Sequence, residues 1–121
     1  SSLKTAKANG KLDIFRASWV ADYPDAQNYL SLFFSENFTP NGPNYTHFKN
    51  VTYDSTYAKA MIESNVEKRI NLYKKIDQIV LEEAPVVVLF YDEVLRFTQK
   101  NIEGLGINPT NLLELKNVQK N

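Results

Sequence analysis

Residues 66–91 read VEKRINLYKKIDQIVLEEAPVVVLFY, and this stretch decides the fold. Apolar side chains recur at helical spacing through its first part, which predicts a helix over Val66–Glu83 with one buried face. That face comprises Ile70, Tyr73, Ile76 and Val80. Pro85 disfavours helical backbone at the residue before it, so the helix should stop there. Residues 86–91 are continuously apolar, which is typical of a strand covered on both faces and central in its sheet.

A second helix is predicted immediately upstream, over residues 54–64. Its apolar side chains, Tyr57, Ala58, Met61 and Ile62, again fall on one side. Ser64 and Glu67 have the spacing of a capping box, in which each side chain satisfies a free backbone donor at a helix start. The two helices are therefore expected to be neighbours separated by a short connection.

The remaining segments predict strands around these helices. Lys11 to Trp19 begins with alternating apolar residues and reads as a strand that becomes more buried toward its end. Pro24 then opens a helix about three turns long, whose apolar face is Ala26, Tyr29, Leu30, Phe33 and Phe34. Residues 35–52 show no periodic spacing of apolar side chains, which predicts a long surface loop. Val94 to Lys100 has alternating apolar and polar residues, which suits a more exposed strand. The fold class is therefore α/β, with a mixed sheet flanked by helices.

Composition limits the classes of protein to consider. The chain has 121 residues, 43% of them hydrophobic, which is enough for one compact core. Fourteen basic and fourteen acidic residues cancel, so a nucleic-acid partner is not expected. The absence of cysteine excludes disulfides, thiolate metal sites and thiol catalysis. No charged segment followed by an apolar one opens the sequence, so we expect any signal peptide to lie upstream.

The residue patterns that enzymes use are missing from the sequence. His47 is the one histidine, which rules out zinc-binding histidine clusters, and we expect it to be solvated or structural. There is no Walker loop and no G-x-S-x-G motif. Asp22 and Asp25 stand three residues apart at a predicted helix start, where acids more often cap the helix than form a catalytic pair. We therefore predict no enzyme activity, no catalytic residue, no metal and no cofactor.

The turn after the first predicted strand carries the side chains best suited to a ligand. Arg16, Trp19 and Asp22 offer a guanidinium, an indole and a carboxylate close together in the sequence. A carboxylate can pair with an ammonium group, a guanidinium can bind a carboxylate, and an indole face can cover an apolar side chain. The three together suit a zwitterionic peptide. Residue types alone leave a second interpretation open, in which Trp19 is buried and Arg16 pairs with Asp22.

Several segments, in order, resemble one family of transport proteins. Residues 12–23 read LDIFRASWVADY, residues 44–50 read NYTHFKN, and RINLY at 69–73 precedes IVLEEAPVVVLFY at 79–91. Together they resemble the peptide and nickel class (family 5) of extracytoplasmic solute-binding proteins of ABC transporters, which includes the dipeptide and oligopeptide receptors. The segments at 69–73 and 79–91 together are the most specific piece, and the resemblance covers nearly the whole chain.

The resemblance implies a fold and a function. The chain would be the C-terminal part of a two-lobed, type II periplasmic-binding-protein-like fold. Residues 1–121 would form a single partial domain, a segment of the C-terminal lobe with a returning tail. Such a protein captures di- or oligopeptides in the periplasm, or as a lipoprotein on the outer face of the membrane, and delivers them to ABC transporter permease subunits. Without the opposing lobe, the exposed half-cleft is expected to self-associate.

The resemblance also implies roles for individual residues. Asp22 matches the acid that pairs with the α-amino group of the peptide, and Trp19 lies beside the bound chain. Arg16 matches a position that some members use near the peptide carboxylate, and the backbone of Val20 and Ala21 would run along the peptide. Asp22 argues against the nickel-binding branch, because a metal complex needs no partner for an amine. A receptor for a nickel chelate or an oligosaccharide, and a truncated domain with only a structural or interaction role, stay open as alternatives.

Overall fold

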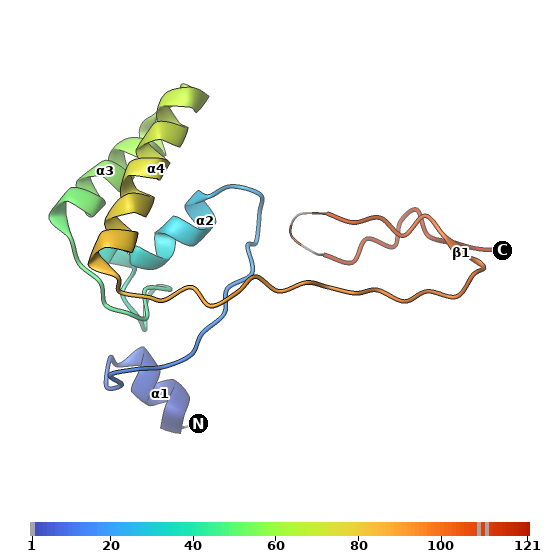
Figure 1. Ribbon diagram of the computed structural model, residues 1–121, viewed down its shortest axis with the longest axis horizontal. Coiled ribbons are helices and arrows are strands. Elements are labelled where there is room, and N and C mark those ends of the chain that lie inside the picture. Colours follow the sequence, from blue (N-terminus) through green and yellow to red (C-terminus); the bar gives the residue numbers. More distant parts are fainter. Residues whose placement is uncertain (1, 109, 111) are drawn as a thin grey trace.

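The computed structural model describes residues 2–108, 110 and 112–121. Helices come first, in the order α1 (Ser2–Ala8), α2 (Gln27–Leu30), α3 (Val51–Ile62) and α4 (Val66–Glu83), with two 3₁₀ helices, η1 (Ser31–Phe33) and η2 (Ser35–Asn37), between α2 and α3. Two short strands, β1 (Ile102–Glu103) and β2 (Gln119–Lys120), follow. Figure 1 shows α2, α3 and α4 packed together, while the chain after α4 extends away and folds back near the C-terminus. We call residues 85–121 the C-terminal arm.

The packing of α3 against α4 forms the centre of the molecule (Figure 1). The bounds of α4 are those that the periodicity predicts. α3 begins and ends slightly earlier than the predicted helix over residues 54–64. Asn50 explains the earlier start, because its side-chain oxygen accepts a hydrogen bond of 3.0 Å from the backbone N–H of Tyr53. Such a cap satisfies one of the free donors at a helix start and fixes where the helix begins.

The two ends of α4 have different capping arrangements. Asn65 is the N-cap, and its side chain accepts a hydrogen bond of 3.0 Å from the backbone N–H of Lys68. The predicted capping box with Ser64 as the cap is therefore wrong by one residue, because the asparagine amide occupies the capping position instead. At the other end, Ala84 has a left-handed backbone with φ 46° and ψ 47°. That conformation ends the helix directly before Pro85, which disfavours right-handed helical backbone at Ala84.

The hydrophobic core lies between α2, α3 and α4. It comprises Leu30, Tyr53, Tyr57, Ile76 and Val80, with Phe33, Phe34, Phe48, Tyr73 and Ile79 packed against it. Aromatic rings dominate, and the Phe34 and Tyr57 rings stack at a centroid distance of 4.7 Å. Tyr53 is fully buried, and its hydroxyl donates a hydrogen bond of 2.6 Å to the backbone carbonyl of Leu30. The polar end of this tyrosine thus ties α3 to α2.

The helix predicted to run on from Pro24 as far as Phe34 is shorter in the structure. α2 and η1 together end at Phe33, and Phe34 has extended backbone with φ −72° and ψ 129°. Asp54 on α3 accounts for the difference. Its carboxylate accepts hydrogen bonds from the backbone N–H and the hydroxyl of Ser35, at 3.0 and 2.7 Å. These bonds hold the chain in a sharp turn that a continuing helix would not permit.

The predicted long loop is present, and one buried side-chain amide holds it in place through hydrogen bonds. Asn44 is fully buried, and its side-chain nitrogen donates to the backbone carbonyls of Phe34 and Phe48 at 3.1 and 3.0 Å. α1, which the sequence analysis did not identify, contacts this loop through the Thr39 hydroxyl, which donates to the carbonyl of Ala8 at 2.7 Å. The loop therefore connects the N-terminal helix to the helical core.

The three predicted strands are not formed in this structure. Residues 11–20 and 86–98 include no strand, and the segment predicted to be a buried central strand is exposed, with Val87 at 80%. Phe97 in the third predicted strand is 92% exposed. The one sheet among the described residues is the antiparallel pair of β1 and β2, apart from an isolated bridge between Phe38 and Asn44, so the predicted mixed sheet is not confirmed. A strand needs a neighbouring backbone to bond to, and no described part of the chain lies beside these segments in that way.

Candidate ligand-binding site

Trp19 and Asp22 meet at one buried side chain, that of Asn28 on α2. The indole Nε1 of Trp19 donates a hydrogen bond of 2.6 Å to Oδ1 of Asn28. The Nδ2 of the same amide donates to Oδ2 of Asp22 at 3.5 Å. Asn28 is 4% exposed, whereas Trp19 is 37% exposed and Asp22 is on the surface. The structure thus holds an indole and a carboxylate together at the surface through a buried amide.

Asp25 has a different role from Asp22. Its Oδ1 accepts a hydrogen bond of 2.8 Å from the backbone N–H of Gln27, the first residue of α2. Asp25 therefore satisfies a helix-start donor, which is the role predicted for both acids. Asp22 differs from that prediction because it accepts from a side chain rather than from a backbone amide. The two carboxylates are engaged with different partners and do not form a catalytic pair.

Side chains of the turn also connect to α3 and α4. Gln27 accepts a hydrogen bond from the Tyr23 hydroxyl, and its Nε2 donates to the hydroxyl oxygen of Tyr57 at 2.5 Å. Burial raises the pKa of Tyr57 above its ordinary value, and the Gln27 hydrogen bond acts in the opposite direction. Burial, followed by the negative charge of Asp25, raises the pKa of Tyr73 on α4 to about 12. The turn is therefore anchored to both long helices by neutral tyrosines.

Arg16 lies apart from the Trp19–Asp22 pair. Its guanidinium carbon is 5.7 Å from the centroid of the Phe90 ring in the C-terminal arm. No ion pair joins Arg16 to Asp22 within the described residues, so the alternative in which these two side chains neutralise each other is not what the structure shows. Of the other two predicted site residues, Val20 is exposed and Ala21 is half-buried.

Arg16 belongs instead to a groove beside α1. The groove has a volume of about 590 Å³, and its charged lining residues are Lys4, Lys7 and Arg16, with no acidic residue among the lining. The ammonium of Lys7 lies 4.2 Å from the centre of the Tyr45 ring and 5.3 Å from that of Phe15, so the faces of both rings stabilise its charge. The groove is a cationic, partly apolar surface separate from the carboxylate of Asp22.

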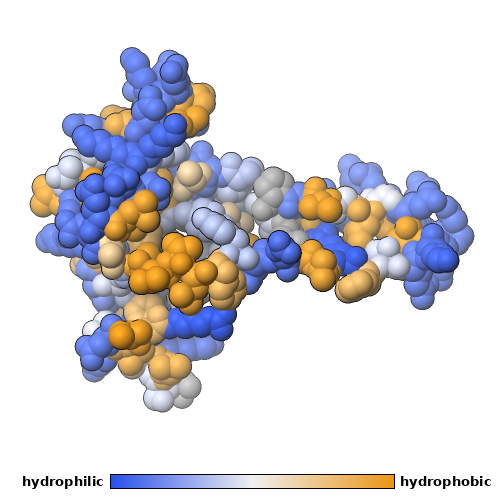
Figure 2. Space-filling view, viewed as in Figure 1, coloured by the Kyte–Doolittle hydropathy of each residue, from blue (hydrophilic) through white to orange (hydrophobic). Residues whose placement is uncertain are grey.

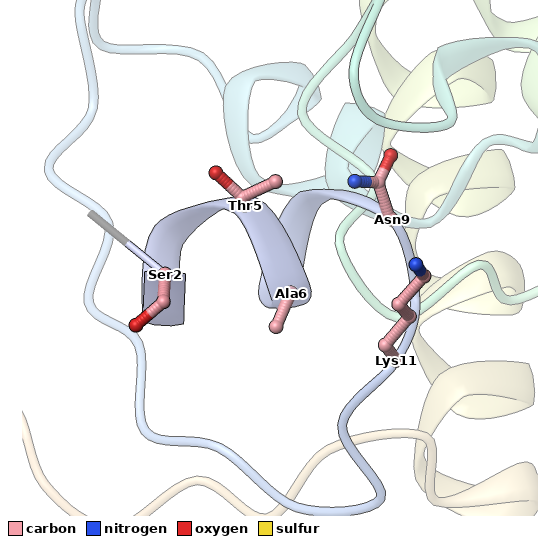
Figure 3. A pocket seen from close by; sticks show the side chains of 5 residues that line it. All are labelled: Ser2, Thr5, Ala6, Asn9 and Lys11. Carbon is pink, nitrogen blue, oxygen red and sulfur yellow. The ribbon is translucent and has the colours of Figure 1, made fainter.

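A second hollow, of about 380 Å³, lies on the side of α1 and contains none of the predicted site residues. Figure 3 shows its labelled side chains, Ser2, Thr5, Ala6, Asn9 and Lys11, pointing in different directions rather than toward one point. A binding site for a small molecule needs polar groups that converge. This hollow therefore adds nothing to the candidate site.

His47 has a structural role, in line with the sequence prediction. Its ring packs edge-on against Phe38 at 5.1 Å, and its Nε2 lies 3.2 Å from the carbonyl oxygen of Thr39. Across residues 2–108, 110 and 112–121, no group of three or more histidine, cysteine or acidic side chains is arranged to hold a metal ion. Over the same residues, no helix is both long and apolar enough to cross a membrane.

Sequence reasoning missed Asn28, which is central to this arrangement. No local signal identifies it, because on the predicted helix Asn28 lies on the side opposite the apolar face. The structure nevertheless buries Asn28, and the donor-only indole of Trp19 and the acceptor-only carboxylate of Asp22 are its hydrogen-bond partners.

Comparisons with known proteins identify relatives of this chain. No family model matches it. The periplasmic murein peptide-binding protein MppA of Escherichia coli K12 is 32% identical over 103 residues, which are 85% of this chain and 18% of MppA. The dipeptide-binding protein DppE of Bacillus subtilis 168 is 24% identical, over 92% of this chain and 20% of DppE. A probable deoxycholate-binding periplasmic protein of E. coli K12, YgiS, is 26% identical, over 85% of this chain and 18% of YgiS.

A solved structure agrees with the sequence comparison. The unliganded open form of the murein tripeptide-binding protein MppA matches with a TM-score of 0.63 and 32% identity, over 69% of this chain and 16% of that one. Over the matched part of the chain the fold is therefore that of a periplasmic binding protein. The resemblance noted in the sequence is confirmed: this chain is a homologue of the periplasmic peptide-binding proteins, and it spans about a fifth of the length of the relatives that it matches.

Proposed function

We propose that this chain is part of the substrate-binding component of an ABC importer, which captures di- and oligopeptides outside the cytoplasm and delivers them to membrane permease subunits. The observation that carries the proposal is the exposed turn where the Asp22 carboxylate and the Trp19 indole meet at one buried amide. Homology to a murein peptide-binding and a dipeptide-binding protein supports peptides as the ligand class. Capture and release require binding and closure only, so the protein is not an enzyme.

In this proposal Asp22 anchors the α-amino group of the peptide. A hydrogen bond between an ammonium and a carboxylate is charge-assisted and stronger than one between neutral groups. Trp19 presents part of its ring to solvent beside that carboxylate, where it can cover an apolar side chain of the ligand. Val20 and Ala21, which lie between them, make no backbone hydrogen bond to another described backbone group. Their N–H and C=O groups are therefore open to pair with the backbone of an extended peptide.

Arg16 serves the carboxylate end of the ligand. It lines a groove that contains Lys4 and Lys7 and no acidic residue. A zwitterionic peptide carries its opposite charges at its two ends, and the separation of Arg16 from Asp22 suits such a ligand better than a direct pair would. An ion pair between the two residues would have left neither charge available.

The exposed segment 86–98 becomes part of a mixed sheet in the longer protein, within a C-terminal lobe of the type II fold. The support comes from its side chains. Val86, Val87, Val88, Leu89, Phe90 and Tyr91 are consecutive apolar residues, and all are exposed in this chain. Figure 2 shows hydrophobic surface on the helical body and again along the arm. Contiguous exposed apolar surface of this size indicates a face that another structure covers. In this proposal, neighbouring strands of the same protein cover it.

A receptor for another solute is the second candidate, favoured by the relative that is described as a probable deoxycholate-binding protein. Such a ligand has one carboxylate and a large apolar body, and the cationic groove around Arg16 would hold it without any role for Asp22. The two candidates therefore differ in whether the Asp22 carboxylate is needed.

The test is calorimetric titration of the complete protein with a pool of di- to pentapeptides. Asp22→Asn removes the charge without changing the shape of the side chain, and Asp13→Asn makes the same change at another exposed acid as the matched control. We expect Asp22→Asn to weaken binding about ten- to hundredfold, since a hydrogen bond to a charged group is lost, and N-acetylated peptides to bind equally weakly to both proteins. Undiminished binding by Asp22→Asn would remove Asp22 from the site. Deoxycholate binding without peptide binding would favour the second candidate.

A further inference from the structure

We propose that Asn28 is a positioning residue, which orients the Asp22 carboxylate and the Trp19 indole toward the ligand; this rests on the proposed role of Asp22 as the amine anchor. Trp19 and Asp22 lie in a segment without regular secondary structure, and both reach the surface. Asn28 is buried and belongs to α2. The helix can therefore define positions that the turn alone would leave loose.

The chemistry of the two partners determines how the Asn28 amide must face. An indole N–H can only donate a hydrogen bond, and an ionised carboxylate can only accept. The amide oxygen therefore faces Trp19, at 2.6 Å, and the amide nitrogen faces Asp22, at 3.5 Å. The asparagine amide offers the two functions on separate atoms, so that one faces each partner. An aspartate would lack the donor, and a leucine of the same shape would lack both.

The backbone around Asn28 is fixed on both sides. Its N–H donates to the carbonyl of Asp25 at 3.1 Å, and its own carbonyl accepts from the Ser31 hydroxyl at 3.0 Å. A short side chain on a fixed helical turn has few rotamers available, particularly when it is 4% exposed. Asn28 is thus the rigid member of the group, and Trp19 and Asp22 are held by it.

The arrangement leaves one oxygen of Asp22 for the ligand. Asn28 approaches Oδ2, and no described residue donates a hydrogen bond to Oδ1. An incoming ammonium group needs an acceptor that already points toward it, because binding sites gain affinity when their groups are ordered in advance. Asn28 supplies this order without adding a second charge that would compete with Asp22 or attract a metal.

The experiment must separate positioning from folding, since Asn28→Leu alone leaves the indole N–H of Trp19 without its acceptor. Trp19→Phe removes that N–H and keeps the ring, so W19F and W19F/N28L form a matched pair that differs only at Asn28. We would titrate both variants of the complete protein with trialanine and with N-acetyl-trialanine. The readout is the ratio of the two affinities, which a purely structural effect leaves unchanged.

We expect the preference for the free amine to fall about tenfold from W19F to W19F/N28L, the size of a lost hydrogen bond to a charged group. Adding Asp22→Asn to W19F/N28L should then lower the preference much less than it does in W19F alone, because the two residues act through one contact. If the ratio of the two affinities is the same in both variants, including when both peptides bind equally more weakly, Asn28 has no positioning role. The role of Asp22 as the amine anchor is then unaffected. Absence of any preference in the wild-type protein overturns the amine anchor, and the positioning role with it.

Discussion

Replacing Tyr53 by phenylalanine tests the contact that joins α3 to α2. The Tyr53 hydroxyl is buried and donates a hydrogen bond of 2.6 Å to the backbone carbonyl of Leu30, and burial raises its pKa above the ordinary value. Phenylalanine keeps the ring in the core and removes only the hydroxyl. The buried carbonyl then loses its donor, which costs about 1–3 kcal/mol. We therefore expect the free energy of unfolding to fall by about 2 kcal/mol, a roughly thirtyfold change in the unfolding equilibrium.

The assay is urea unfolding followed by circular dichroism at the helical minimum. With a urea dependence of about 2 kcal/mol per molar, the midpoint should move down by about 1 M. Tyr29→Phe is the matched control, because Tyr29 is on α2 next to Leu30, whose carbonyl accepts the Tyr53 hydrogen bond, and the side chain of Tyr29 is exposed. Removing a solvated hydroxyl should change stability by less than about 0.5 kcal/mol. If Tyr53→Phe costs no more than Tyr29→Phe, the hydroxyl contact does not stabilise the core and the reasoning fails.

Two further predictions test other parts of the structure. Ala84→Gly should stabilise the chain by about 1 kcal/mol, because Ala84 has a φ of 46° that glycine adopts without strain. The control, Ala58→Gly on the exposed side of α3, should destabilise the chain by about the same amount. A thermal melt in which Ala84→Gly is less stable than wild type would contradict the left-handed cap. Val87→Lys should leave the melting temperature of this chain unchanged, since Val87 is exposed, but should reduce concentration-dependent self-association in sedimentation velocity if the apolar arm is the contact. Equal association of Val87→Lys and wild type would place any such contact elsewhere.

The helices could be predicted from the sequence because their signals are local. The helical spacing of Ile70, Tyr73, Ile76 and Val80 is recognisable without knowing what the helix packs against. The predicted bounds of α4 were correct. The N-cap was misplaced by one residue because Ser64 and Asn65 are both good caps, and only the structure shows which one accepts from the helix. The early end of η1 depended on Asp54, far along the chain, and no local pattern carries that information.

The strand predictions were wrong because strand formation depends on parts of the chain that are distant in the sequence. The apolar run after Pro85 has the composition of a buried strand, but a strand exists only where another backbone completes its hydrogen bonds. In this chain the run is exposed. Only part of the candidate site was predictable. Trp19 and Asp22 were chosen for their chemistry and do lie together. Arg16 instead contacts Phe90 of the arm and lines the groove beside α1. Asn28, the common partner of Trp19 and Asp22, could be assigned only once the helix was in place.

The short connection between α3 and α4 has a consequence for how the chain acquires its structure. Helices that are adjacent in sequence meet after closing a loop of only a few residues, and contacts of this kind form quickly. Every described residue that is buried lies before residue 84. The helical unit can therefore order itself as soon as α4 has been synthesised, independently of the arm. The arm depends on slower, distant pairing, and until that occurs its apolar side chains are the part of the molecule most exposed to chaperones and to aggregation.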